Sequence, residues 1–173
     1  MKAAVVLAAL SLALVLQSTL GGISLDAGTR VNFVLVAVIY CALSFGAMTG
    51  LLAGLAGGLA QDAIAGAVLG VGGISKTLIG FVVGVLGAQF IVTQPLTRFV
   101  MFLGASVVHE FCFQALTAVV ESRGVRFQYS AIFAQAAVNG LLGILAFQIV
   151  EKTPGLMQRR DARRASFGSR RQF

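Results

Sequence analysis

The residues best suited to chemistry in this chain are five polar side chains that stand inside otherwise apolar runs. They are Asp62, Lys76, His109, Glu110 and Asn139. Inserting a charged side chain into hydrocarbon costs at least about 2.5 to 3.5 kcal/mol, so such residues usually find a partner or line a polar cavity. They are therefore the first candidates for ion pairing, proton transfer or solute binding.

Catalytic and metal chemistry find little support among these residues. The chain contains one histidine, His109, whereas a zinc site needs three or four ligands. A Ser-His-Asp triad would require this histidine, in the middle of an apolar run, to meet a serine with access to water. We therefore expect no catalytic residue, no metal and no cofactor, and we expect the protein not to be an enzyme.

Asp62 and Lys76 flank the glycine-rich stretch 65–73 at equal distances from its centre. If this stretch is the turn of a helical hairpin, the two side chains reach similar depth and can pair. Both stand near helix ends, where a long side chain can extend towards water, so structural pairing is the simpler interpretation. A transport or proton-relay role is the alternative.

His109 and Glu110 stand at the centre of the apolar run 98–120, and Asn139 lies at a matching level in the next run. Gln135 shares that half of the run with Asn139. Amide side chains can donate and accept hydrogen bonds across a helix interface in a membrane. We expect a hydrogen-bonded cluster here, with a proton-coupled path as the alternative.

The composition indicates an integral membrane protein. Of the 173 residues, 58% are apolar and 11% are charged, and the mean hydropathy is +0.93. Soluble domains average about 45 to 50% apolar and about 25% charged residues, so this chain could not cover itself with enough polar surface. Its two cysteines, Cys41 and Cys112, lie in apolar runs and are predicted to be small buried residues rather than a disulfide.

Six membrane-spanning helices are predicted from the apolar runs. A span needs about 20 mostly apolar residues, and the uncharged stretch 31–61 would make one helix about 46 Å long against a core of about 30 Å. We therefore divide it into two short spans that turn near Gly46. The six predicted spans are 3–20, 31–45, 46–64, 74–92, 98–120 and 130–150. Lys2 precedes the first, as in a signal peptide, but 17–21 offers no A-x-A cleavage pattern.

The basic residues predict that both termini lie in the cytoplasm. The formal net charge is +7, and seven of the 13 Lys and Arg lie in the segment 151–173. With Lys2 and Arg98 these make nine basic residues inside, against three outside, namely Arg30, Arg123 and Arg126. The charge gathers in a tail and not on a folded surface with interleaved aromatics, so no nucleic acid is expected as a partner.

The segment 151–173 is predicted to be a disordered basic tail that lies on anionic lipid. Its role could be limited to fixing the topology, or it could bind an acidic cytoplasmic partner.

Glycine recurs at every fourth position through the third predicted span and beyond it. The residues concerned are Gly50, Gly54 and Gly58, followed after Asp62 by Gly66 and Gly70, and the next span adds Gly80 and Gly84. Residues four apart lie on one helix face, and small residues let two helices approach closely in a membrane. This face could dock a partner helix, but internal packing of a compact bundle is the interpretation we favour.

Several motifs resemble the rod shape-determining protein MreD family. They are Arg30-Val31-Asn32-Phe33, Tyr40, Gly54-x3-Gly58-x3-Asp62, Leu69-Gly70-Val71 and Val138-Asn139-Gly140. The similarity extends over about residues 30 to 150, and the Gly-x3-Asp motif followed by Leu-Gly is its most specific part. Many members of the family have proline where this chain has Val31.

This resemblance implies a six-span protein of the bacterial cytoplasmic membrane, similar in fold to the substrate-binding subunits of energy-coupling-factor transporters. It also implies binding to the single-span protein MreC and membership of the elongation machinery. The other components of that machinery are MreB filaments, the glycosyltransferase RodA and a class B penicillin-binding transpeptidase. No chemistry of its own is implied.

Two functional hypotheses follow. The first is a non-catalytic scaffold whose glycine faces grip the anchor of MreC, while its tail meets lipid or a filament. The second is a small-molecule-binding subunit of a transporter, suggested by the buried ionisable residues, and it requires a polar cavity. Handling of a lipid intermediate is a third possibility, but the sequence offers no particular residue in support of it.

Overall fold

The computed structural model describes residues 2–20, 31–90, 94–122, 124 and 128–151. These residues form six helices and no strand: α1 (Lys2–Leu20), α2 (Phe33–Phe45), α3 (Ala47–Ala65), α4 (Val71–Gln89), α5 (Pro95–Val120) and α6 (Tyr129–Glu151). The predicted all-helical fold with six helices is thus confirmed. The basic tail after Glu151 and the three arginines assigned to the outside lie outside the described residues.

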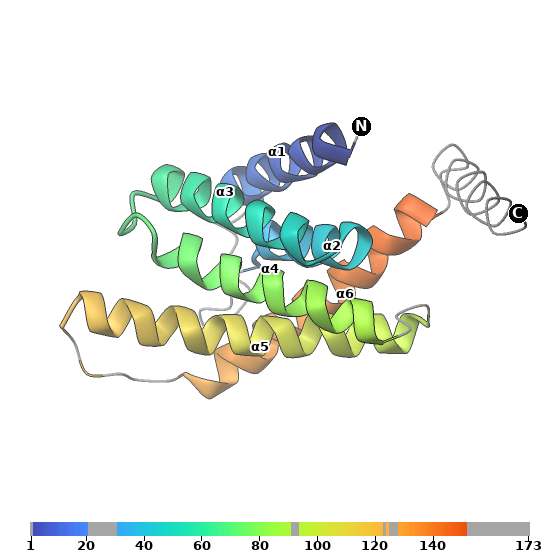
Figure 1. Ribbon diagram of the computed structural model, residues 1–173. Coiled ribbons are helices and arrows are strands. Elements are labelled where there is room, and N and C mark those ends of the chain that lie inside the picture. The colour runs from blue at the N-terminus through green and yellow to red at the C-terminus, as the bar shows by residue number, and fades with distance from the viewer. Residues whose placement is uncertain (1, 21–30, 91–93, 123, 125–127, 152–173) are drawn as a thin grey trace, which may run out of the picture.

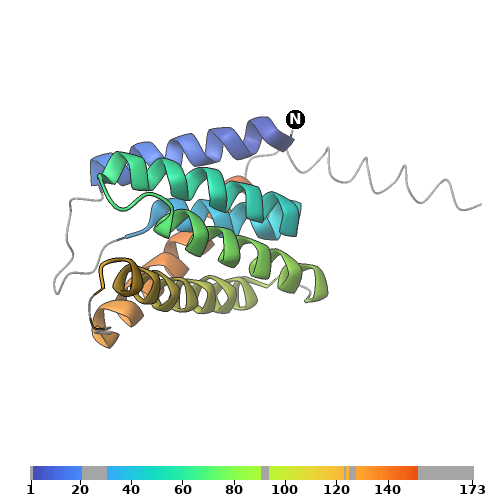
Figure 2. The same cartoon turned by 60° about the vertical axis from the view of Figure 1, so that its left-hand side comes forward.

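The helices run back and forth as one bundle, so that α1 begins and α6 ends at the same end of it (Figure 1). The turned view of Figure 2 shows the same alternation and shows that α6 crosses the bundle obliquely. Four helices, α1, α4, α5 and α6, are long and apolar enough to cross a membrane. α2 has 13 residues, and α3 is rich in glycine. That these two helices also cross the membrane remains a proposal.

The core is built around α2, the shortest helix. Its sequence is apolar on every face, which is typical of a helix buried on all sides. Val34, Leu35, Val38 and Ile39 are completely buried, and α2 contacts each of the five other helices. Its burial explains how so short a helix is held, because every turn contributes apolar contacts to the bundle.

The chain reverses between α2 and α3 at one residue, where the sequence predicts a turn. Gly46 follows Phe45 with a φ of 94° and a ψ of 176°. This φ is one that residues with a side chain rarely adopt. The two antiparallel helices then pack directly against each other.

Two predicted helix starts differ by three residues from those in the structure, and the other four differ by one or two. α4 begins at Val71 rather than at residue 74, because a side chain from the preceding helix satisfies the first amides of this glycine-rich stretch, as described below. α5 begins at Pro95 rather than at residue 98. Proline suits the first position of a helix, where its missing N–H is not needed.

The glycines of α3 and α4 pack against each other. A Cβ at Gly50 would meet the carbonyl oxygen of Gly80, and one at Gly80 would meet that of Gly50. A Cβ at Gly54 would meet the carbonyl oxygen of Lys76, and one at Gly58 would lie 2.6 Å from Cα of Gly73. Real side chains do not approach a backbone so closely, so these positions bring the two helices into direct backbone contact.

The remaining glycines singled out by the sequence are placed differently. A Cβ at Gly84 would meet the backbone of Ala47 at the start of α3. Gly66 and Gly70 lie outside the helices, in the turn from α3 to α4, with φ of 62° and 101°. Nothing lies within 4 Å of a Cβ at either turn position. The four-residue repeat therefore runs past the end of α3, and its last two members serve the turn and not a helix face.

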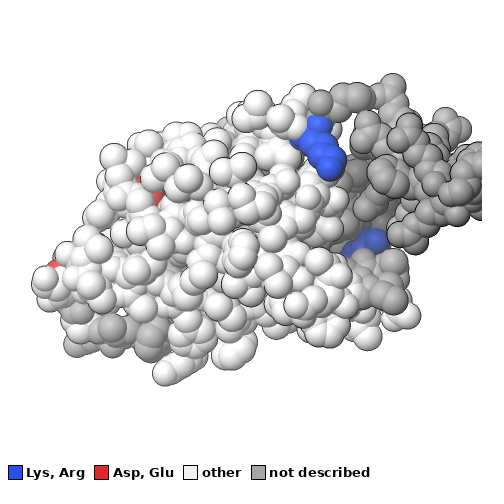
Figure 3. All heavy atoms as spheres, viewed as in Figure 1, with Lys and Arg blue, Asp and Glu red and all other residues white. Residues whose placement is uncertain are grey.

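The outer surface of the bundle is apolar between its two ends. Leu12, Met48, Leu78 and Phe133 are among the large apolar side chains that are more than half or about half exposed. In Figure 3 the basic side chains lie near the end where α1 begins, the acidic ones lie towards the other end, and the surface between them is uncharged. A surface of this kind suits contact with lipid and not with water. Of the two cysteines, Cys41 is buried as predicted, whereas Cys112 is partly exposed.

Replacing Gly54 by leucine should destabilise the bundle, because the side chain would push the backbone of α4 away from α3. Overpacking typically costs about 1 to 3 kcal/mol, so the temperature of thermal unfolding in detergent should fall by several degrees. Gly104→Leu is the matched control, since nothing lies within 4 Å of a Cβ at Gly104. Equal unfolding temperatures for the two variants, measured by circular dichroism, would contradict the close packing of α3 and α4.

Candidate functional site

Asp62, in the last turn of α3, caps the start of α4. Its Oδ2 accepts hydrogen bonds from the backbone N–H groups of Gly70 at 3.0 Å, Gly72 at 3.0 Å and Gly73 at 3.3 Å. The first amides of a helix have no partner within it, and the positive end of the helix dipole favours a carboxylate there. A residue of the preceding helix thus takes the role that an N-cap side chain usually has.

The glycine at position 72 fits this contact closely, because a Cβ there would meet Oδ1 of Asp62. Gly58, one turn before Asp62, brings α3 against the same stretch of α4. The two glycines and the carboxylate therefore act together. This is a physical reason for the order Gly54-x3-Gly58-x3-Asp62 followed by a glycine-rich turn.

The suggested pairing of Asp62 with Lys76 is wrong. No ion pair or hydrogen bond joins Lys76 to another of the described residues, and Oδ2 of Asp62 is held by three amides instead. Lys76 is only 2% exposed. Its ammonium lies 5.9 Å from the ring centre of Phe113 on α5, a distance at which a cation is attracted to an aromatic face.

His109 and Glu110 on α5 lie next to this lysine. His109 Nε2 is 3.4 Å from the hydroxyl oxygen of Ser75 on α4, and His109 Nδ1 is 3.9 Å from Oε2 of Glu110. Gln114 donates to Oε1 of Glu110 at 3.0 Å, and Gln135 on α6 donates to Oε2 at 3.1 Å. The expected contact of Gln135 with the His-Glu pair is therefore present, and it joins α6 to α5.

Asn139 lies beside this group but fixes the backbone instead of joining it. The side chain is completely buried. Its Oδ1 accepts from the backbone N–H of Asn32 at 3.3 Å, and its Nδ2 donates to Ser106 at 3.4 Å. Asn32 in turn caps α2 by accepting from the N–H of Leu35 at 3.0 Å. Two asparagines of the family motifs thus hold the start of the central helix.

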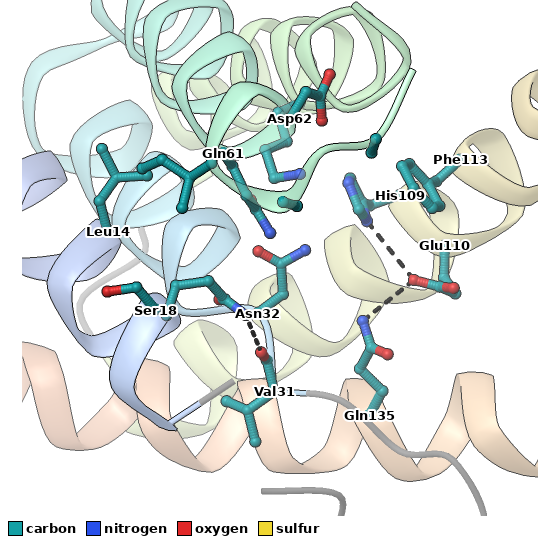
Figure 4. A pocket seen from close by; sticks show the side chains of 15 residues that line it. Leu14, Ser18, Val31, Asn32, Gln61, Asp62, His109, Glu110, Phe113 and Gln135 are labelled. Carbon is teal, nitrogen blue, oxygen red and sulfur yellow. Dashed lines mark hydrogen bonds and ion pairs between the residues drawn. The ribbon is translucent and has the colours of Figure 1, made fainter. Parts of the chain in front are cut away.

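These polar groups surround a cavity of about 500 Å³ at the end of the bundle opposite the start of α1. All six helices or their flanking residues contribute to its lining. The polar residues of the lining are Gln17, Ser18, Asn32, Gln61, Asp62, Lys76, His109, Glu110 and Gln135. In the close view of Figure 4, Gln61 from α3 lies across the cavity from His109 and Glu110, and Gln135 approaches from α6.

Sequence reasoning missed Gln17, Asn32 and Gln61 as parts of this site. Gln17 on α1 donates to the carbonyl of Val31 at 3.1 Å and accepts from the N–H of Phe33 at 2.9 Å. An amide side chain within an apolar run was the available signal, since such a group needs partners in a membrane. Among the described residues, no three His, Cys, Asp or Glu side chains lie together as a metal site would require.

Replacing Asp62 by alanine should leave three amides of α4 without a partner and weaken the turn between α3 and α4. Loss of a helix cap costs about 0.5 to 2 kcal/mol, so the unfolding temperature should fall and protease should cut faster within residues 66–70. Asp62→Asn keeps one acceptor oxygen and should lie between the two. Unchanged cleavage and stability in the alanine variant would rule out the capping role.

Comparison with known proteins adds the family. The family described as rod shape-determining protein MreD matches residues 2–155 of the chain. No curated protein and no solved structure matches the chain, so similarity in fold to energy-coupling-factor subunits stays a prediction. The matched range contains the glycine faces, Asp62, Lys76, the His-Glu pair and Asn139. The chain therefore belongs to the MreD family of rod shape-determining proteins.

Proposed function

We propose that this protein is a non-catalytic membrane scaffold that binds MreC in the bacterial elongation complex and so supports rod shape and lateral peptidoglycan synthesis. The family match over residues 2–155 carries this proposal, because the family acts in rod shape determination. RodA, a class B penicillin-binding transpeptidase and MreB filaments are the further partners that we propose. The described residues offer apolar helix faces for contact with other membrane proteins and no soluble domain.

In this proposal all six helices cross the bacterial inner membrane, with both termini in the cytoplasm. The start of α1 and the end of α6 lie at the same end of the bundle (Figure 1), which an even number of crossings requires. The basic segment that follows α6 favours the cytoplasmic side. The polar cavity then opens towards the outer half of the membrane.

We place the contact with MreC in the groove between α1 and α3. The glycines of α3 that face α4 are occupied within the bundle, so a docking face must lie elsewhere. The groove has a volume of about 350 Å³, and its lining is apolar apart from Lys2 and Thr49. Ala3, Ala53 and Ala56 are part of that lining, and small residues let a partner helix approach closely in lipid. The single membrane helix expected of MreC suits such a groove.

Filling this groove should weaken the complex. Ala56→Trp places a large ring in it from an exposed position, so recovery of MreC with the tagged protein from solubilised membranes should fall about tenfold. Ala134→Trp on α6, also at an exposed position, is the matched control and should leave recovery unchanged. If neither variant changes recovery, the contact lies elsewhere. If MreC is not recovered with the unaltered protein, the scaffold proposal fails.

Reporter fusions test the proposed topology. Green fluorescent protein fused after Phe173 should fluoresce, because it folds in the cytoplasm, and alkaline phosphatase at the same point should be inactive. Alkaline phosphatase inserted between α5 and α6, at Gly124, should be active because that turn faces the periplasm. The reverse pattern of activities would contradict the proposed orientation.

A second function, a small-molecule-binding subunit of a transporter, is supported by the polar cavity. Such a subunit needs a polar space of this kind, and Glu110 lines it together with Lys76 and Gln135. Cells that lack the protein should then lose uptake of a solute and keep their rod shape. Loss of rod shape with unchanged uptake would favour the scaffold.

A further inference from the structure

One buried cation in the cavity is paired with no anion among the described residues. Lys76 lines the cavity, is almost completely buried, and forms neither a hydrogen bond nor an ion pair with any of the described residues. The carboxylates of Asp62 and Glu110 act on its charge only from a distance. A lysine ammonium carries three hydrogen-bond donors, and burying them unpaired is unfavourable. The site is therefore short of an acceptor, and an anionic one suits it best.

Two buried acceptors around the same cavity have no donor among the described residues. The hydroxyl of Ser75 donates to the carbonyl of Val71 at 2.9 Å, so its oxygen is left to accept from Nε2–H of His109. In this neutral tautomer Nδ1 of His109 carries a lone pair, and it has no hydrogen-bond partner among the described residues. Oε1 of Gln61 is also buried without one.

The carboxylate of Glu110 lies beside Nδ1 of His109. Its Oε2 is 3.9 Å from Nδ1 of His109, and its side chain is 16% exposed. Two acceptors at this distance favour a donor that hydrogen-bonds to both. Because one of them is a carboxylate, a positively charged donor is favoured over a neutral one. Asp62 also lines the cavity, and its Oδ2 is already held by three amides at the start of α4.

We propose that the cavity binds a small zwitterion, with its oxyanion at Lys76 and its ammonium group at Glu110 and Nδ1 of His109. The oxyanion meets an ammonium that has no ion pair, and the ammonium of the guest meets the unpartnered Nδ1 of His109 beside the partly exposed carboxylate of Glu110. The volume of about 500 Å³ leaves room for an amino acid or a phosphoethanolamine group. Both share this chemistry, one as a free solute and the other as the head group of a phospholipid.

Binding should be measured with the full-length purified protein. In detergent the probes are L-alanine and O-phosphoethanolamine, with ethanolamine as the cation alone and inorganic phosphate as the anion alone. At least one zwitterion should raise the unfolding temperature by several degrees and bind at least tenfold more tightly than either single-charge probe. In the second arm, nanodiscs containing phosphatidylethanolamine are compared with nanodiscs of phosphatidylglycerol, and retained lipid is identified by native mass spectrometry.

Two pairs of variants locate the binding. Lys76→Met and Glu110→Gln should each lower the affinity at least tenfold, whereas Lys2→Met and Glu121→Gln make the same chemical changes outside the cavity and should leave it unchanged. Circular dichroism and size exclusion check that each variant folds, and Glu110→Gln carries the test if Lys76→Met does not fold. This inference does not depend on MreC binding, which is scored separately by recovery of the complex.

The outcomes separate the two sources of the guest. Binding of soluble zwitterions in detergent identifies a free solute, and selective retention of phosphatidylethanolamine alone identifies a lipid head group. The proposal is overturned if no zwitterion binds in either arm, if a single-charge probe binds as tightly, or if both cavity variants bind as well as the unaltered protein.

Discussion

The structure depends on the close approach of α3 and α4, which one carboxylate completes. Gly50, Gly54 and Gly58 bring the two backbones into contact, and Asp62 then lies where it can accept from the first amides of α4. In lipid there is no hydrophobic force between helices, so close packing and hydrogen bonds must hold them together. A buried carboxylate is tolerable here because three donors and the helix dipole stabilise it.

The polar cavity follows from the same arrangement. Once Asp62 is used in capping, Lys76 one turn further along α4 has no anion of its own and lies in a space completed by α5 and α6. Five helices and the two residues before α2 line that space, so it exists only in the finished bundle. Buried polar groups that lack partners are uncommon in native proteins, which is why this end of the bundle, and not its glycine faces, is where a ligand is expected.

The helices could be predicted from the sequence because the thickness of the membrane sets the length of apolar run that one crossing needs. The uncharged stretch 31–61 is too long for one crossing, so the turn at Gly46 was predictable. The contact between Gln135 and Glu110 was predictable because the two residues lie at matching depth. The role of Asp62 was not. Its partners are backbone amides, which every residue carries, so no residue type marks them. Gln61 escaped notice because an uncharged amide on a helix gives no pattern until its neighbours are placed.

One hydrogen bond has a consequence for how the protein is made. The backbone N–H of Asn32, at the start of the central helix, is satisfied by the side chain of Asn139, 107 residues later. The ribosome therefore synthesises α2 long before it synthesises Asn139, the residue that satisfies this N–H group. Until the last helix enters the membrane, the nascent chain must keep this end of α2 near water or in contact with the insertion machinery. The start of α2 thus reaches its final hydrogen bonding only when α6 has been made.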